Sequence, residues 1–263
     1  MTLEQKFTEL KASGGKALVC FLTAGDQPLS DLPAIISLLA ESGADVVEVG
    51  IPFSDPFGEG PTIQASSQRA LDNGANVRTI LDAIAKCDVN IPIVTMGYYN
   101  PMLRMGLEDF ARASKRAGVT GTIVSDLVPD EADSWNTACL ETELETVYLV
   151  APTSTDERIS QVAGMTTGFV YVVSRTGVTG TESSVPTDVQ GLVAKVKSLT
   201  SKPACVGFGI STPEHVRMVC QVADGAVVGS SLVKMLHENW GTPSGSEKIR
   251  EYVSSLKEAT RRS

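Results

Sequence analysis

Residues 46–64 read VVEVGIPFSDPFGEGPTIQ, a stretch that combines a short strand, a loop and the start of a helix. The run Val46–Val49 is apolar and β-branched, which is typical of a buried strand, but it carries a carboxylate, Glu48, in its middle. Prolines, glycines and further acids fill the loop, and Thr62 is a suitable N-cap for the helix that follows. Because burying an unpaired carboxylate is costly, Glu48 is expected to be either a satisfied structural acid or a functional one.

The same strand-then-helix pattern recurs along the whole chain. Apolar runs of strand length begin at Ala17, Val46, Ile91, Val119, Thr146, Phe169, Ala204 and Gly225. These runs do not alternate with polar residues, as expected for parallel strands that are buried on both faces. Eight such units in 263 residues favour a (β/α)8 TIM barrel over an open doubly wound sheet, for which an early G-x-G-x-x-G turn would be expected.

The rest of the chain organisation is simple. Residues 1–13 form an amphipathic pattern that predicts an additional N-terminal helix before the first strand. No linker, low-complexity tract or charge block divides the sequence. We therefore expect residues 1–263 to form one barrel domain.

Composition narrows the class of protein. The formal net charge of -9 argues against a nucleic-acid partner and against an anionic membrane surface. No apolar run approaches the roughly 20 residues that span a bilayer, and the polar N-terminus is unlike a signal peptide. The five cysteines are scattered without a C-x-x-C pair, which is typical of a reducing compartment. A soluble, cytoplasmic protein is expected.

In a barrel of this kind the active site lies at the carboxyl ends of the strands, and phosphate is commonly held by the last two loops. Here those loops are Gly207–Ser211, which reads GFGIS, and Gly229–Ser231, which reads GSS. Each places small residues before a predicted helix, where free backbone N–H groups and the helix dipole attract an anion. Taken singly such loops are ordinary turns, but the pair predicts a phosphate site.

The remaining strand ends supply acids and tyrosines. These candidate site residues are Glu48, Asp55, Glu59, Tyr98, Asp126 and Tyr171. Both histidines, His215 and His237, lie on predicted helices, and no lysine lies in a predicted strand. A histidine triad, a metal cluster and a Schiff-base aldolase are therefore disfavoured, and acid–base catalysis by carboxylates is expected. The loop from Ser174 to Pro186 is long enough to act as a lid.

Over essentially its whole length the chain resembles the α subunit of tryptophan synthase. The matching segments are FLTAGD (21–26), VEVGIPFSDPFGEGPTIQ (47–64), YYNP (98–101), VSDLVPDE (124–131), SRTGVTG (174–180), GFGIS (207–211) and GSSLVK (229–234). The signature E-x-G-x-P-F-S-D-P together with R-x-G-V-T-G, in this order, is highly specific.

The resemblance implies a lyase that cleaves indole-3-glycerol phosphate to indole and glyceraldehyde 3-phosphate by a retro-aldol reaction. It assigns Glu48 as the general acid–base, which protonates indole C3 and helps to deprotonate the glycerol hydroxyl. A second carboxylate in the following loop stabilises positive charge at the indole N1–H, and here Glu59 takes that place. The tyrosine that matches Tyr171 lies close to the catalytic acid.

The resemblance also implies substrate contacts. Phe21, Tyr98 and Phe208 match the indole pocket, and Gly180, Gly209, Gly229 and Ser230 match the phosphate contacts. Arg175 and Thr179 match lid residues that close over the substrate, and Asp126 is expected to bind substrate from its strand end.

One residue departs from the family pattern. The family has an aspartate in an A-D-G-P context, whereas this chain reads Gly58-Glu59-Gly60-Pro61. The charge is kept, but the side chain is one methylene longer. Since a displacement of about 1 Å at a catalytic group can cost about a hundredfold in rate, weak or absent lyase activity is an open alternative.

The partner is also an expectation from the resemblance. Pro52 and Asp55 match positions near the contact with the tryptophan synthase β subunit, which implies a complex of two α and two β subunits. No cofactor is expected on this chain, since pyridoxal phosphate belongs to the β subunit. Two alternatives keep the fold: a non-catalytic subunit that activates a β partner, and a free-standing lyase that releases indole. A barrel enzyme for an unrelated phosphorylated substrate is a remote fourth possibility.

Overall fold

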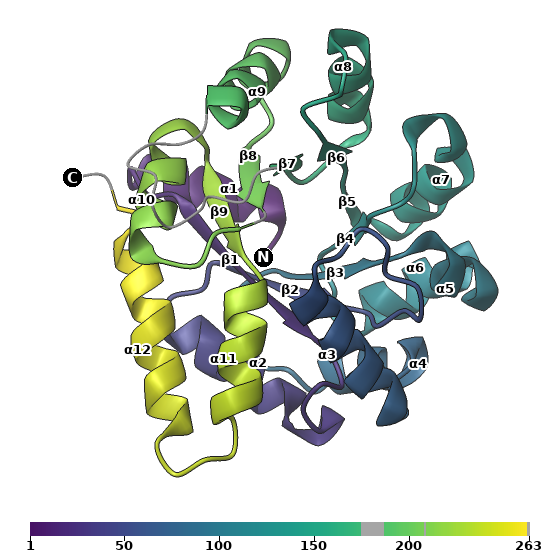
Figure 1. The fold of residues 1–263 in the computed structure, drawn as a ribbon. Helices are drawn as coiled ribbons and strands as arrows, with labels where there is room; N and C mark the ends of the chain where they lie inside the picture. Colours follow the sequence, from purple (N-terminus) through teal and green to yellow (C-terminus); the bar gives the residue numbers. More distant parts are fainter. Residues whose placement is uncertain (175–186, 208, 262–263) are drawn as a thin grey trace.

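The structure is a computed structural model that describes residues 1–174, 187–207 and 209–261. Its centre is one sheet of parallel strands, surrounded by helices (Figure 1). The strands are β1 (Ala17–Thr23), β2 (Val46–Gly50), β3 (Ile93–Gly97), β4 (Gly121–Val124), β5 (Glu145–Val147), β6 (Leu149–Val150), β7 (Val170–Val173), β8 (Ala204–Gly207) and β9 (Gly225–Val228).

The strand order is β5-β4-β3-β2-β1-β9-β8-β7-β6. The two ends of this order, β5 and β6, are consecutive in the chain and separated only by Tyr148. The sheet therefore returns to its starting segment and forms a nearly closed barrel. The predicted barrel is confirmed, with the expected fifth strand, 146–150, divided into two short strands.

A helix or loop follows each strand of the barrel. The helices are α1 (Leu3–Ala12), α2 (Leu32–Glu41), α3 (Pro61–Asp72), α4 (Val77–Ile84), α5 (Tyr99–Met105), α6 (Leu107–Arg116), α7 (Asp133–Thr142), α8 (Asp156–Met165), α9 (Thr187–Leu199), α10 (Pro213–Val222), α11 (Ser230–Asn239) and α12 (Gly245–Glu258). Short 3-10 turns, η1 (Leu29–Asp31) and η2 (Pro129–Glu131), precede α2 and α7.

Two local predictions differ from the structure. Helix α3 begins at Pro61 with Gly60 as its N-cap, so the assignment of Thr62 as the cap was wrong. Proline is well suited to the first helical position because its missing N–H would have no partner there. Strand β3 is followed by two helices, α5 and α6, where the strand-then-helix pattern predicts one, and Pro101 fits in the first turn of α5 for the same reason.

The strands bury both of their faces. On β1, Ala17, Val19 and Phe21 belong to a hydrophobic cluster that also contains residues of β7 and β9, and this cluster fills the barrel interior. The intervening Leu18, Cys20 and Leu22 belong to the larger cluster between the barrel and the helices. Glu48 is the register partner of Phe21, so its side chain points into the interior as well.

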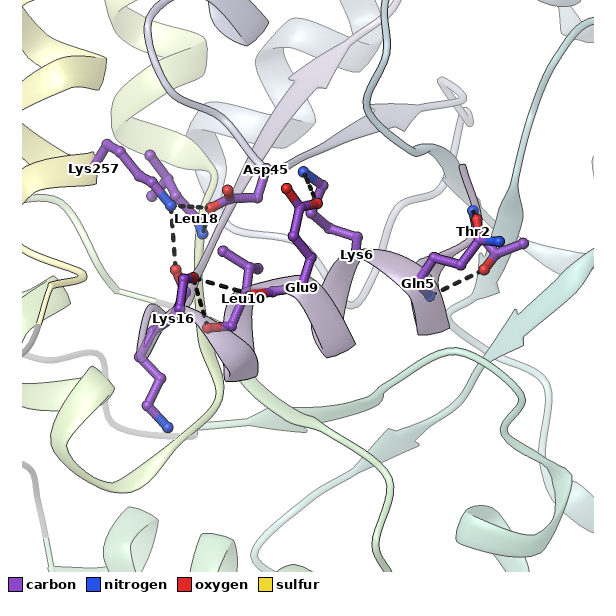
Figure 2. Close-up of polar contacts among 10 residues, drawn as sticks. Thr2, Gln5, Lys6, Glu9, Leu10, Lys16, Leu18, Asp45 and Lys257 are labelled. Atoms are coloured by element: carbon purple, nitrogen blue, oxygen red, sulfur yellow. Dashed lines mark hydrogen bonds and ion pairs between the residues drawn. The ribbon is translucent and has the colours of Figure 1, made fainter.

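Helix α1 closes the N-terminal end of the barrel. Its apolar residues Leu3, Phe7 and Leu10 belong to the interior cluster. Its start is fixed by a capping box between Thr2 and Gln5, drawn in Figure 2. The predicted N-terminal helix is therefore confirmed, and it fills the end of the barrel opposite the expected site.

The C-terminal helix is attached to the barrel by a part-buried ion pair. Lys257 of α12 lies 2.6 Å from the Asp45 carboxylate, which also accepts a hydrogen bond of 2.7 Å from the Leu18 backbone N–H (Figure 2). Asp45 is thus shared by β1 and α12, and it ties the two together where β2 is about to start.

Candidate active site

A cavity of about 410 Å3 opens at the carboxyl ends of the strands. Its lining comes from the ends of five strands and from the loops after β2, β7, β8 and β9. The lining residues are Phe21, Glu48, Glu59, Gly60, Ile63, Met96, Tyr171, Ser174, Gly209, Ile210, Ser211, Val227, Gly229, Ser230 and Ser231. The cavity lies at the end of the barrel where the sequence predicts the active site.

Glu48 lies at the bottom of this cavity with no exposed surface. Among the described residues, neither of its carboxyl oxygens has a hydrogen-bond partner. Burial, and secondarily the charge of Glu59, raises the pKa of Glu48 to about 8. At neutral pH its carboxyl group is therefore mainly protonated, and it can donate a proton and take one back.

Glu59 faces the same cavity from the loop between β2 and α3. Burial raises the pKa of its carboxyl group. The loop backbone is held in place around it: the Glu59 N–H donates to the Pro56 carbonyl at 3.0 Å, and the Gln64 side chain donates to the Glu59 carbonyl at 2.8 Å. These bonds hold the backbone from which the Glu59 side chain extends.

Tyr98 anchors this loop to the end of β3. Its hydroxyl accepts a hydrogen bond of 3.0 Å from the Gly58 N–H. Its ring stacks on Phe53, with the centroids 5.1 Å apart, and meets the edge of Phe57 at 5.3 Å. Tyr98 lines a small pocket beside the main cavity, and Phe21, Glu59, Ile63 and Met96 line both. The β2–α3 loop, which carries Glu59, and the ring of Tyr98 are thus packed together as one unit.

Tyr171 of β7 lies in the cavity wall and is buried. Burial, followed by the charges of Glu48 and Glu59, raises its pKa well above the ordinary value for tyrosine. The phenol therefore stays neutral and keeps its proton as a hydrogen-bond donor. The ring fits only because its neighbour is Gly207, where a Cβ atom would clash with the Tyr171 hydroxyl.

The opposite end of the cavity is suited to an anion. Gly229, Ser230 and Ser231 form the N-terminus of α11, which no described side chain caps. Gly209, with φ of +77°, leads the β8–α10 loop along the other side. Free N–H groups and the positive end of the helix dipole both favour a negatively charged group at such a terminus.

Most sequence-predicted site residues come together here. Those that line the main cavity are Glu48, Glu59, Tyr171, Phe21, Gly209, Gly229 and Ser230, and Tyr98 lines the adjoining pocket. Pro52 is buried in the β2–α3 loop, and Asp55 is exposed on it. Arg175, Thr179, Gly180, Phe208 and the lid loop beyond Ser174 lie outside the described residues.

Asp126 is placed differently from its expected role. Its carboxylate accepts a hydrogen bond of 2.7 Å from the Tyr99 N–H, at the first residue of α5. It does not line the cavity. In this structure Asp126 fixes the start of a helix that the sequence did not predict.

Several residues of the site carried no motif of their own. Met96 and Val227 line the cavity because alternate residues of a barrel strand point inward. Counting every second residue along the predicted strands could have identified both. Ile63 comes from the first turn of α3. His215, although on a helix as predicted, lies with Nδ1 3.4 Å from the Ser211 hydroxyl, next to the cavity wall.

A second cavity lies at the opposite end of the barrel, where Lys16 and Lys197 both pair with Asp224. In the described part of the chain no group of three or more His, Cys, Asp or Glu residues could hold a metal ion. Nor does any helix in those residues have the length and apolar character to cross a membrane.

The chain matches the family model described as tryptophan synthase alpha chain over residues 7–261. The tryptophan synthase alpha chain of Geobacter sulfurreducens is 48% identical over 255 residues, which cover 96% of each chain. That of Arabidopsis thaliana is 40% identical over 260 residues, covering 98% of this chain and 94% of its own.

Solved structures agree in fold over the full length. Tryptophan synthase from M. tuberculosis, in its aminoacrylate-bound form, matches with a TM-score of 0.88 at 35% identity, covering 98% of this chain and 99% of that one. Tryptophan synthase subunit alpha from Legionella pneumophila matches with a TM-score of 0.90 at 33% identity, covering 99% of this chain and 98% of that one. The chain therefore belongs to the tryptophan synthase alpha chain family and is an indole-3-glycerol-phosphate lyase.

Proposed function

We propose that the cavity carries out retro-aldol cleavage of indole-3-glycerol phosphate with Glu48 as the general acid–base. The observation that carries this proposal is the position of Glu48, which is fully buried at the bottom of the cavity without a hydrogen-bond partner among the described residues. A structural acid would be paired, because an unpaired buried carboxyl group destabilises the fold. A catalytic acid–base benefits from a pKa near neutrality, and burial supplies that shift.

The proton balance needs only this one group. Protonated Glu48 donates its proton to indole C3, which leaves positive charge on the ring nitrogen. The bond between C3 and the glycerol carbon then breaks, and its electron pair restores the aromatic ring. The hydroxyl on that carbon becomes the aldehyde, and its proton returns to the Glu48 carboxylate. The products are indole and glyceraldehyde 3-phosphate, and Glu48 ends as it began.

Glu59 is proposed as the second carboxylate, which accepts a hydrogen bond from the indole N1–H and stabilises the positive charge on the ring. Glu59 lines the same cavity as Glu48 and also lines the adjoining aromatic pocket, and both observations support this role. Phe21 and Tyr98 offer the ring faces against which indole would pack. Tyr171 would keep a neutral hydroxyl beside the reacting carbons.

The phosphate is proposed to bind at the N-terminus of α11. Gly229 and Ser230 would contact it from one side, and Gly209 from the other. This places the phosphate and the two acids at separate parts of one cavity, as a substrate with an indole ring at one end and a phosphate at the other requires. Arg175, Thr179, Gly180 and Phe208 remain proposed substrate contacts on the family resemblance alone. Asp126 was expected to bind substrate because of its strand-end position, and this expectation has no support from the cavity lining.

We also propose that this cytoplasmic enzyme works with a tryptophan synthase β subunit, in a complex of two α and two β subunits. The β2–α3 loop would provide contacts through Pro52 and Asp55. The same loop carries Phe57, which is 78% exposed. Leu103 of α5 and Val128 after β4 are also exposed apolar residues at 52% and 47%. Apolar and aromatic residues of this kind are typical of the centre of a protein interface.

The test is release of indole from indole-3-glycerol phosphate by the isolated chain, with and without an added β subunit. We expect indole in both cases, with a higher rate in the complex. Release that the β subunit leaves unchanged would indicate a free-standing lyase. Absence of indole under both conditions would rule out the retro-aldol proposal.

A further inference from the structure

The two loops at the anion end of the cavity are joined by a side chain from outside it, Tyr252 of α12. Its hydroxyl lies 2.9 Å from the Ser211 carbonyl oxygen in the β8–α10 loop and 2.7 Å from Ser231 Oγ in the first turn of α11. Ser211 and Ser231 both line the cavity, whereas Tyr252 does not. Tyr252 thus contacts both loops without facing the space that a ligand would occupy.

The hydrogen bonds of this cluster can be assigned from the donors available. A tyrosine hydroxyl has one proton, and the Ser211 carbonyl can only accept. Either Tyr252 donates to Ser211 and accepts from the Ser231 hydroxyl, or it donates to Ser231. In the second case the Ser231 proton goes to the Ile210 carbonyl, 3.5 Å away. In both cases the Ser231 proton is used within the protein.

The adjacent serine is different. Ser230 is exposed at the start of α11, and its hydroxyl has no partner among the described residues. Its proton is therefore available to a bound anion. The two consecutive serines therefore have different roles. Ser230 can contact the phosphate, and Ser231 connects α11 to the β8–α10 loop through Tyr252.

We propose that Tyr252 is a positioning residue for phosphate binding, which holds the β8–α10 loop and the N-terminus of α11 at a fixed separation. This inference rests on the proposed function, since it assumes that the phosphate of the substrate occupies this end of the cavity. With the bridge present, the N–H groups of both segments are already arranged around the place where the phosphate binds. Without it the loops must be ordered on binding, which weakens affinity.

The test is the variant Tyr252→Phe, which keeps the ring and removes only the bridging hydroxyl. Calorimetry with glycerol 3-phosphate, an unreactive compound with the same phosphate group, should give a Kd about threefold to tenfold higher than wild type. The affinity for indole, which has no phosphate, should not change. With the substrate, KM should rise while kcat stays near the wild-type value.

A matched control is Tyr148→Phe. Its hydroxyl also donates one hydrogen bond, of 2.7 Å to the Asn136 side chain, and it contacts neither loop. This variant should leave the Kd for glycerol 3-phosphate unchanged even if it lowers thermal stability as much as Tyr252→Phe. Equal weakening in both variants would overturn the positioning role, because it would reflect a general loss of stability.

Ser231→Ala provides a second test that does not alter Tyr252. If the bridge is the shared cause, Ser231→Ala should weaken glycerol 3-phosphate binding to a similar extent, and the double variant should be no weaker than either single one. Additive losses, or an unchanged Kd in both single variants, would contradict the bridge. If wild type cleaves the substrate and the two single variants bind glycerol 3-phosphate with the same Kd as wild type, only this inference fails. If wild type neither binds nor cleaves, the proposed function fails with it.

Discussion

Glu48 and Glu59 line the same cavity, and the negative charge of Glu59 adds to burial in raising the pKa of Glu48 to about 8. The two acids come from one strand and the loop directly after it, so their relative position is set locally. Tyr98 fixes that loop through the Gly58 N–H and through Phe53. The arrangement keeps a proton on Glu48 at neutral pH while a second carboxyl group stays within the same space.

Stability should fall as the pH rises through the window set by Glu48. The pKa of its carboxyl group is about 4.5 in the unfolded chain and about 8 in the folded one. Between these pH values the unfolded state binds fewer protons, so rising pH favours unfolding. The loss should be on the order of 4 kcal/mol by pH 8. Urea unfolding of wild type and Glu48→Gln across this range should show the variant gaining relative stability with pH. A difference that stays constant with pH would contradict the shifted pKa.

Removing the charge of Glu59 should lower the pKa of Glu48. Glu59→Gln keeps the size of the side chain, so the pH window in which wild type loses stability should end at a lower pH in this variant. The same unfolding experiment measures the shift without any enzyme assay. An unchanged window would mean that burial alone sets the pKa of Glu48.

Shortening Glu59 should slow the reaction rather than restore it. The backbone around Glu59 is held by hydrogen bonds to Tyr98, Pro56 and Gln64, so Glu59→Asp cannot easily move closer to the substrate. We expect kcat to fall on the order of tenfold to a hundredfold, the usual effect of misplacing a catalytic group by about 1 Å. Steady-state indole release measures this. A faster variant would show that glutamate is a handicap at this position.

The link between Asp45 and Lys257 should be important for stability but not for chemistry. Asp45→Ala would leave the Lys257 ammonium group and the Leu18 N–H without their partner. Because the pair is part-buried, the loss should lie between the roughly 1 kcal/mol of an exposed pair and the about 3–5 kcal/mol of a fully buried one. The control is Glu41→Ala, which breaks the exposed pair between Arg250 of α12 and Glu41 of α2 and should cost about 1 kcal/mol or less. Denaturant unfolding distinguishes the two, and equal losses would contradict the buried role of Asp45.

The sequence predicted the barrel because each strand is an apolar run followed by a helix, and because the strand ends carry recognisable loops. It also singled out Glu48, since an acid inside an apolar run conflicts with burial, and the side chain lines the cavity; its catalytic role stays a prediction. It did not predict α5 as a helix separate from α6, because proline is common in turns but is equally suited to the first turn of a helix, where Pro101 lies. The capping of α5 by Asp126 depends on that missed helix.

Tyr252 could not be predicted for a different reason. It lies on the last helix, 21 and 41 residues from the serines that it contacts, and no local motif connects them. Only the packing of α12 beside α10 and α11, visible in Figure 1, brings its hydroxyl to both loops. Contacts of this kind depend on tertiary structure, whereas strand ends and helix caps are encoded locally.

The most direct test of the account is the rate of indole release by Glu48→Gln compared with wild type at pH 7. Glutamine fills the same space but cannot exchange a proton, and general acid–base catalysis contributes about a hundredfold or more. We predict a loss of at least that size in a variant that remains folded and is more stable than wild type at pH 8. A variant that keeps more than about a tenth of the wild-type rate would contradict the assignment of Glu48 as the catalytic acid–base.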